Sequence, residues 1–210
     1  MIAIIQAAGW PIWPLIISSI IGLALIIERF LSLRPQLVMP ATLVDEVLMV
    51  SQNGVPAADV LEKLATSSTL GGVLAAGFRA VASDPRVKEA TLRQVFENAG
   101  RTAMHDLNRY LSAIGTIASS APLLGLLGTI IGMIEIFGAQ TSAGGMGNPQ
   151  QLASGISVAL YNTAFGLIVA IPALMCHRHF RNRLDTFQLG MEQAAERLVP
   201  HLLRLGAGVR

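Results

Sequence analysis

The chain has 210 residues, of which 52% are hydrophobic and 13% are charged, and its formal net charge is +2. Its single cysteine, Cys176, excludes an intramolecular disulfide bond. The 15 Lys and Arg residues fall into two blocks, nine in residues 29–109 and six in residues 178–210. No aromatic side chains interleave with a basic patch, so the charge does not indicate nucleic-acid binding. Charge sorted away from apolar runs in this way is typical of an integral membrane protein.

Three apolar runs predict three transmembrane helices, at residues 1–30, 110–137 and 152–177. Residues 1–27 hold no ionisable side chain, and uncharged runs of 24 and 25 residues follow at 111–134 and 152–176. A helix needs roughly 20 such residues to cross the bilayer core. No basic residue precedes the first run, so we expect a permanent span and not a cleaved signal peptide. The sequence therefore predicts an all-α membrane protein with three spans.

Residues 31–109 are predicted to form a helical cytoplasmic domain. Pro35 and Pro40 end the first helix. Short helices are then expected from Pro40, from 56 to 64 and from 69 to 83, because turn residues separate these stretches.

The second and third spans are both predicted to extend beyond the membrane. From residue 86 to about 137 the pattern stays helical, which predicts one continuous helix of about 50 residues. Residues 178–210 predict a cytoplasmic C-terminal helix. Between the two spans, the glycine-rich and uncharged residues 138–151 predict a short periplasmic loop.

The basic blocks also predict the orientation of the chain. Three spans place residues 31–109 and the C-terminal helix on one face, and both basic blocks lie there. The positive-inside rule makes that face cytoplasmic. The N-terminus and the 138–151 loop are then on the periplasmic side.

Small residues recur along one face of the second and third spans. They are Gly125, Gly128 and Gly132 on the second span, and Ala159 and Gly166 on the third. Spacings of three and four residues place each set on a single helix face. Small residues let the backbones of membrane helices approach closely, so these positions predict helix packing.

Polar residues near mid-membrane leave two interpretations open. Thr129, Asn162 and Thr163 either belong to the packing faces or line a polar cavity that forms when several copies assemble. Glu135 is an ionisable residue within the second span, where a carboxylate indicates function. Because Glu135 lies near the outer end, it is either a site facing a proton or a partner, or a solvated interfacial residue.

The sequence does not predict an enzyme, a metal site or a cofactor. No metalloprotease, serine-hydrolase or phosphate-loop motif occurs. His177 and His179 adjoin Cys176, but one turn of helix cannot aim all three side chains at a single ion.

Two stretches of the chain resemble the ExbB/TolQ/MotA proton-channel family, and the ExbB branch most. Residues 121–133 (APLLGLLGTIIGM) resemble the second-span motif. Residues 155–167 (GISVALYNTAFGL), followed by Ile-Pro-Ala at 171–173, resemble the third-span motif. Glu28-Arg29 at the end of the first span also matches. Together with three spans and a large cytoplasmic segment, the likeness covers essentially the whole chain.

This resemblance implies a homo-pentamer in the bacterial inner membrane whose second and third spans line a pore. The pore would hold the single-span helices of an ExbD-like partner, which carries the essential membrane aspartate. Proton flow would power a TonB-like protein and, through it, transport across the outer membrane. Thr129 and Thr163 match the family's pore threonines, whereas Val158 stands where enterobacterial ExbB-type relatives have a glutamate.

Other functions remain open from the residues. A TolQ-type subunit of the Tol-Pal envelope system would share the same motifs, and the ion could be H⁺ or Na⁺. A structural membrane scaffold and a substrate carrier are further alternatives. Three spans without an internal repeat argue against the carrier.

Overall fold

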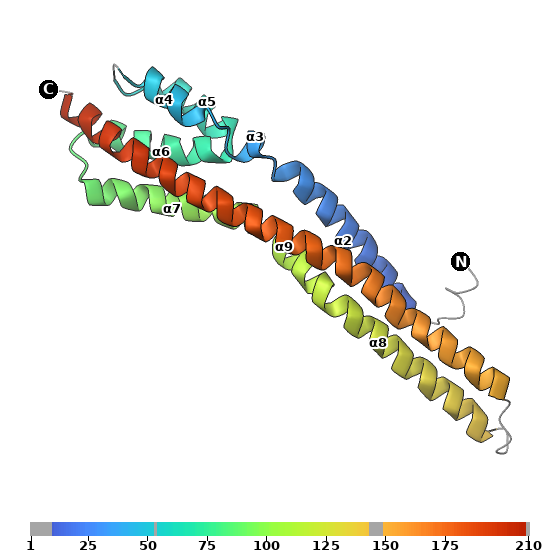
Figure 1. The fold of residues 1–210 in the computed structure, drawn as a ribbon. Coiled ribbons are helices and arrows are strands. Elements are labelled where there is room, and N and C mark those ends of the chain that lie inside the picture. Colours follow the sequence, from blue (N-terminus) through green and yellow to red (C-terminus); the bar gives the residue numbers. More distant parts are fainter. Residues whose placement is uncertain (1–9, 53, 143–148, 209–210) are drawn as a thin grey trace. The chain divides into compact units, whose positions relative to one another are not determined.

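The structure is a computed structural model that describes residues 10–52, 54–142 and 149–208, and the regular elements in this part of the chain are helices (Figure 1). The chain divides into two compact units. The span unit comprises residues 1–28 and 110–179, and the stem unit comprises residues 29–109 and 180–210. Each unit is described by itself below.

Three helices contribute to the span unit: α2 (Ile12–Ser32), α8 (Leu111–Ser142) and the first half of α9 (Pro149–Gly208). By length and composition, three helical stretches of the described chain can cross a membrane, which confirms the prediction of an all-α protein with three spans. Leu15, Ala121 and Ala170 form a buried cluster that joins the three helices. Many large apolar side chains of α8 and of the first half of α9 stay exposed, as expected for surfaces that meet lipid or further protein.

The loop predicted at residues 138–151 is longer than the segment that separates α8 from α9, because both helices extend into it. Helix α8 reaches Ser142, because no proline or charge interrupts residues 138–142. Helix α9 begins at Pro149, a residue well suited to the first helical position. Residues 143–148, the middle of the predicted loop, lie outside the described residues, as do residues 1–9 of the predicted first span.

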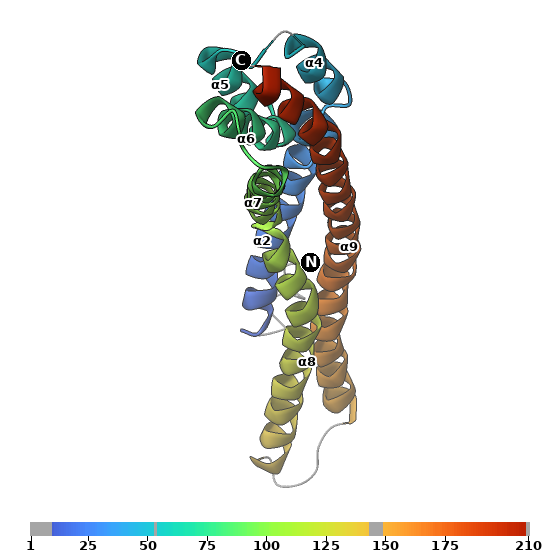
Figure 2. The same ribbon diagram turned by 90° about the vertical axis from the view of Figure 1, so that its left-hand side faces the viewer.

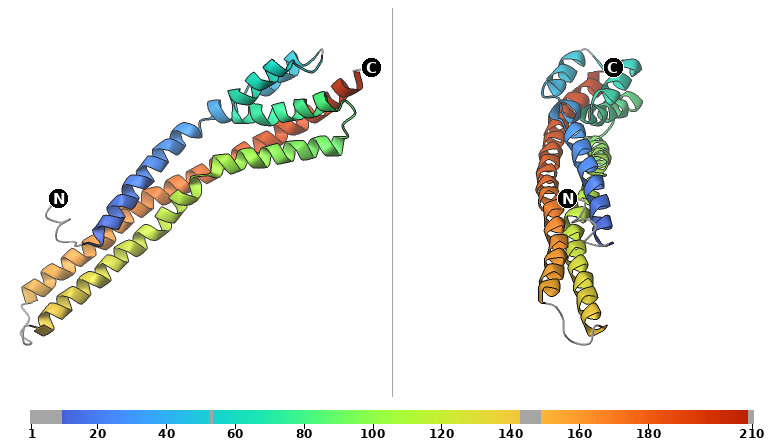
Figure 3. Two further views of the ribbon diagram at one scale, coloured as in Figure 1. Left: turned by 180° about the vertical axis from the view of Figure 1, so that it is seen from behind. Right: turned by 90° about the vertical axis from the view of Figure 1, so that its right-hand side faces the viewer.

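Short helices and the second half of α9 build the stem unit (Figure 3). The short helices are α3 (Pro35–Val38), α4 (Leu43–Val50), α5 (Ala58–Ser67), α6 (Thr69–Ser83) and α7 (Glu89–Asn108). Phe78, Leu92 and Phe180 are among the most deeply buried side chains of its core. Gly77 lets α6 and α7 pack closely, because a Cβ atom there would lie 2.2 Å from Cζ of Phe96.

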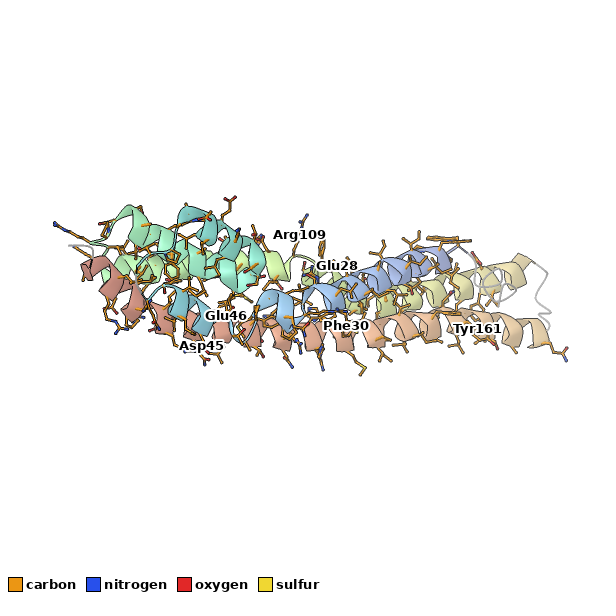
Figure 4. All side chains as sticks on the ribbon, turned by 90° about the horizontal axis from the view of Figure 1, so that it is seen from above. Glu28, Phe30, Asp45, Glu46, Arg109 and Tyr161 are labelled. Atoms are coloured by element: carbon orange, nitrogen blue, oxygen red, sulfur yellow. The ribbon has the colours of Figure 1, made fainter. Side chains whose placement is uncertain are left out.

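Helix α4 is attached to α9 by polar contacts. Ser51 is fully buried, and its Oγ lies 2.7 Å from Nε2 of His201. On the surface, Arg197 donates a hydrogen bond of 2.6 Å to Asp45 in the first turn of α4 (Figure 4). Burial lowers the pKa of the His201 imidazole, and the nearby charge of Arg204 lowers it further.

Helix boundaries differ from the prediction at four places. The structure starts α4 at Leu43 and α5 at Ala58, two to three residues after the prolines expected to begin them. It also adds α3, whose first residue is Pro35. The helix predicted over residues 86–137 is present as one helical stretch of 50 residues, Glu89–Gly138, with a turn at Arg109 and Tyr110 that separates α7 from α8.

Candidate functional site

Helices α8 and α9 pack against each other in antiparallel directions within the span unit (Figure 2). The order of the contacts shows this, since Gly115 lies next to His177, Gly125 next to Asn162, and Gly132 next to Ala159. The small-residue faces seen in the sequence therefore meet in the folded chain.

The two backbones lie very close together at Gly125 and Gly166. A Cβ atom on Gly125 would lie 2.7 Å from the carbonyl oxygen of Asn162 and 3.0 Å from the Cα atom of Thr163. A Cβ atom on Gly166 would lie 2.6 Å from the carbonyl oxygen of Ala121. These neighbours are backbone atoms, which cannot move aside as a flexible side chain can. Only glycine allows this approach without separating the helices.

The contact continues toward the C-terminal end of α8 through Gly128 and Gly132. A Cβ atom on Gly128 would lie 2.8 Å from Cβ of Asn162, whose side chain is only 2% exposed. A Cβ atom on Gly132 would lie 3.2 Å from Cβ of Ala159, which is also buried. The structure thus brings together Asn162 and the five residues predicted for packing.

Thr129 and Thr163 lie on the same edge of this helix pair. Each follows a contact residue, Gly128 on α8 and Asn162 on α9, so each is turned by about 100° from the contact. Seen from one end, residue numbers advance clockwise around α8 and counter-clockwise around the antiparallel α9. The two rotations therefore bring both threonines to one side. Both side chains are half-buried.

Several hydroxyl groups of the spans, that of Thr129 among them, are bonded within their own helices. Thr129 Oγ1 donates to the carbonyl oxygen of Leu126 at 2.7 Å, and Ser157 Oγ donates to that of Ala153 at 2.9 Å. Such bonds satisfy the hydroxyl hydrogen in an apolar environment and leave an oxygen lone pair available. Thr129 also borders a shallow groove of about 470 Å³ along α8, otherwise lined by Ile130, Met133, Ile134 and Phe137.

Comparison with known proteins assigns this helix pair to a family. Residues 65–193 match the model of the MotA/TolQ/ExbB proton channel family. The chain belongs to this family. The matched range includes α8 and the α9 residues that α8 contacts, and therefore all the predicted site residues.

Two relatives of this proton-channel family cover most of the chain. The biopolymer transport protein exbB1 of Vibrio cholerae serotype O1 is 31% identical over 174 residues, which are 80% of this chain and 74% of that protein. The putative biopolymer transport protein ExbB-like 3 of Synechocystis is 32% identical over 197 residues, 91% of this chain and 90% of that protein. A Helicobacter pylori biopolymer transport protein ExbB is 40% identical over 80 residues, 38% of this chain and 54% of its own length.

Family and relatives together define the function in outline. The chain is a bacterial membrane protein with a proton-channel role in biopolymer transport. The family is one of channels and not of enzymes. In the described part of this channel protein, no group of three His, Cys, Asp or Glu side chains is placed to hold a metal ion.

Glu135 lies apart from the threonine edge of the channel helices. It follows Gly128 by seven residues, two helical turns, and so lies on the α8 face that carries the glycines. Its side chain is exposed. Tyr161, labelled in Figure 4, lies on α9 next to Asn162 and is 45% exposed. The side chain of Val158 lies outside the described ones.

Sequence reasoning missed one buried charge at the end of α2, in the stem unit of this channel protein. The Arg29 side chain is only 4% exposed, and its Nη1 donates a hydrogen bond of 2.7 Å to the carbonyl oxygen of Leu107. The next residue, Phe30, packs edge-on against Phe180 of α9, with ring centroids 4.8 Å apart (Figure 4). The Glu28-Arg29 pair was visible in the sequence, but its contact with a residue 78 positions away was not.

Proposed function

We propose that this chain is an ExbB-type subunit of a proton-driven motor in the bacterial inner membrane. Five copies surround a pore, and an ExbD-like single-span protein occupies it. Proton flow through the assembly energises a TonB-like protein and thereby transport across the outer membrane. The N-terminus lies in the periplasm and the C-terminus in the cytoplasm.

The shared edge of Thr129 and Thr163 is the observation that carries the pore proposal. Because the glycine contacts hold α8 and α9 together, each copy contributes both hydroxyls from a single edge. A ring of copies with this edge inward has a pore lined by hydroxyls. The exposed apolar side chains of α8 and α9 support the same arrangement, since neighbouring copies and lipid would cover them.

The proton-binding carboxylate of this pore comes from the partner. Glu135 is the only carboxylate in residues 110–177, and it does not share the threonine edge. The partner's membrane helix therefore supplies the acid, and the threonines of this chain solvate the proton's path. Each proton crossing 100 mV releases roughly 2.3 kcal/mol to drive movement.

Replacing Thr163 by Val tests the pore assignment, because valine keeps the shape and removes the hydroxyl. We expect Thr163→Val to abolish proton flux in proteoliposomes that contain the ExbD-like partner, and to abolish energised uptake in cells. Thr116→Val is the matched control, because Thr116 is an exposed threonine of α8 that donates to its own helix at Ser112. Full flux in Thr163→Val would refute the pore assignment.

Native mass spectrometry of the detergent-extracted protein tests the assembly. Co-expression with the ExbD-like protein is expected to give five copies of this chain with partner chains bound. A monomer or dimer that takes up no partner would contradict the motor and would leave the glycine faces as ordinary helix packing. Co-purification with a TolQ-system partner instead would assign the chain to the Tol-Pal branch.

A further inference from the structure

A histidine lies in the contact between α8 and α9, at the end of the span unit far from Glu135. The Nε2 atom of His177 lies 2.9 Å from the position that a Cβ atom on Gly115 would take, and Cδ2 lies 3.1 Å from it. Glycine at residue 115 thus leaves room for the imidazole to lie against the α8 backbone. His177 is half-buried, and among the described residues no group forms a hydrogen bond or an ion pair with its ring.

The imidazole lies along the edge that carries the two threonines. His177 follows Thr163 by fourteen residues, which is within about 40° of four full helical turns. Gly115 precedes Thr129 by the same number of residues, so it also returns to the threonine edge of α8. Fourteen residues advance about 21 Å along a helix. The edge therefore carries hydroxyls and, about 21 Å nearer the start of α8, an imidazole.

No carboxylate of the two channel helices competes for a proton at this end, since residues 111–134 and 152–179 contain neither Asp nor Glu. The residues on either side of His177 in α9 are each turned by about 100° from it and so do not share its face. The other titratable or charged groups at this end of the span unit are Glu28 of α2, Tyr110 before α8, and Cys176, Arg178 and His179 of α9.

We propose that His177 is the proton acceptor at the cytoplasmic end of the pore. A water molecule in the pore transfers a proton to the neutral imidazole. The imidazolium then releases a proton to cytoplasmic water, which restores the neutral ring. Histidine suits this step because it is the side chain whose charge changes between about pH 5 and 8, whereas a threonine hydroxyl does not titrate there. The proposal rests on the proposed function, in which the threonine edge lines the pore and this end faces the cytoplasm.

Proton flux in proteoliposomes that contain the ExbD-like partner tests the role of the imidazole. At a fixed membrane potential and equal pH on both sides, we expect His177→Gln to lower the flux by roughly tenfold or more, because an amide cannot take up the proton. The flux of the unmodified complex should decrease between about pH 8 and 5, where a histidine acceptor becomes already protonated, and His177→Gln should lack this decrease. His179→Gln is the matched control, because His179 is exposed and is turned by about 200° from His177.

A phenylalanine variant distinguishes proton transfer from helix packing. His177→Phe keeps a ring against Gly115 and removes both nitrogens, so we expect its flux to be as low as that of His177→Gln at an unchanged copy number. Normal flux in His177→Phe would show that the ring acts by packing and would overturn the proposal. Normal flux in His177→Gln together with loss of flux in Thr163→Val would overturn this inference alone. No flux in the unmodified complex would refute the proposed function and the inference with it.

Thiol labelling tests the location of the side chain without reference to flux. In a Cys176→Ser background, His177→Cys is expected to react, in the assembled complex, with a membrane-impermeant thiol reagent applied from the cytoplasmic side. Glycine-facing Ala159→Cys is the matched control, because Ala159 is buried in the same helix contact and should stay unlabelled. A cysteine at residue 177 as unreactive as the one at residue 159 would show that water does not reach this position and would overturn the proposal.

Discussion

Adding one methyl group at Gly166 tests whether α8 and α9 form a close pair. A Cβ atom at this position would lie 2.6 Å from the Ala121 carbonyl oxygen and 3.2 Å from the Cα atom of Gly125. Ordinary contact begins at about 3.4 Å, so the backbones must separate by about 0.8 Å in Gly166→Ala. Separation weakens many dispersion contacts at once, because each falls off steeply with distance.

The magnitude follows from two opposing terms. Forcing a methyl group into a packed contact costs about 1–3 kcal/mol. Alanine recovers up to about 1 kcal/mol because it is a better helix former than glycine. We therefore expect the free energy of unfolding to fall by up to about 2 kcal/mol in Gly166→Ala.

Two further glycines make the test a graded series. A Cβ atom at Gly132 would lie 3.2 Å from Ala159 Cβ, which requires a shift of only about 0.2 Å, so we expect little change in Gly132→Ala. A Cβ atom at Gly138 would meet nothing within 4 Å, and Gly138→Ala is expected to gain up to about 1 kcal/mol. Stability is measured by SDS titration in mixed micelles with helix content read by circular dichroism. If Gly166→Ala proves as stable as Gly138→Ala, the close contact does not exist.

Two further predictions follow from contacts inside each unit, one in the stem unit and one in the span unit. Burial lowers the pKa of the His201 imidazole in the folded protein, so this group is protonated at a higher pH in the unfolded chain than in the folded one. Thermal stability should therefore fall as pH drops below about 6.5. It should level off once the folded imidazole is also protonated. His201→Gln should flatten this dependence, and parallel melting curves for both proteins would contradict it. In a Cys176→Ser background, Gly132→Cys with Ala159→Cys should form a disulfide, because the two Cβ positions lie 3.2 Å apart, near the separation of roughly 3.5–4.5 Å in a disulfide. If α8 and α9 move as one body, oxidation leaves proton flux unchanged, whereas a loss of flux that a reductant reverses would show that the helices must separate.

Local patterns were sufficient for the helices and for the packing face. The spans followed from the length of the apolar runs, and Thr69–Ser83 was predicted with the boundaries that α6 has. The glycine contact was predictable because helical spacing places Gly125, Gly128 and Gly132 on one face, and that face needs a partner of small residues. These inferences use residues close together in the sequence.

The interruption at Arg109 and Tyr110 was not predictable from local signals. Residues 100–120 contain no proline, and the turn itself contains no glycine, so no helix breaker marks the position. Near this turn Arg29 donates a hydrogen bond to the carbonyl oxygen of Leu107, whereas the sequence shows Arg29 only as one of several basic residues near a membrane end. A charge that orients the chain in the membrane and a charge that bonds a distant carbonyl oxygen look the same in sequence.

The sequence also could not separate the polar residues of the third span, and the structure does so by rotation around the helix. Asn162 points into the contact with Gly128 and is buried, whereas Thr163, one residue later, is turned to the edge that Thr129 shares. Glu135 is six residues from Thr129, a rotation that takes it well away from this edge. In the proposed pore the edge therefore offers hydroxyls and no charge. A proton passing along this edge meets no carboxylate of residues 110–177, which supports the proposal that the partner supplies the acid.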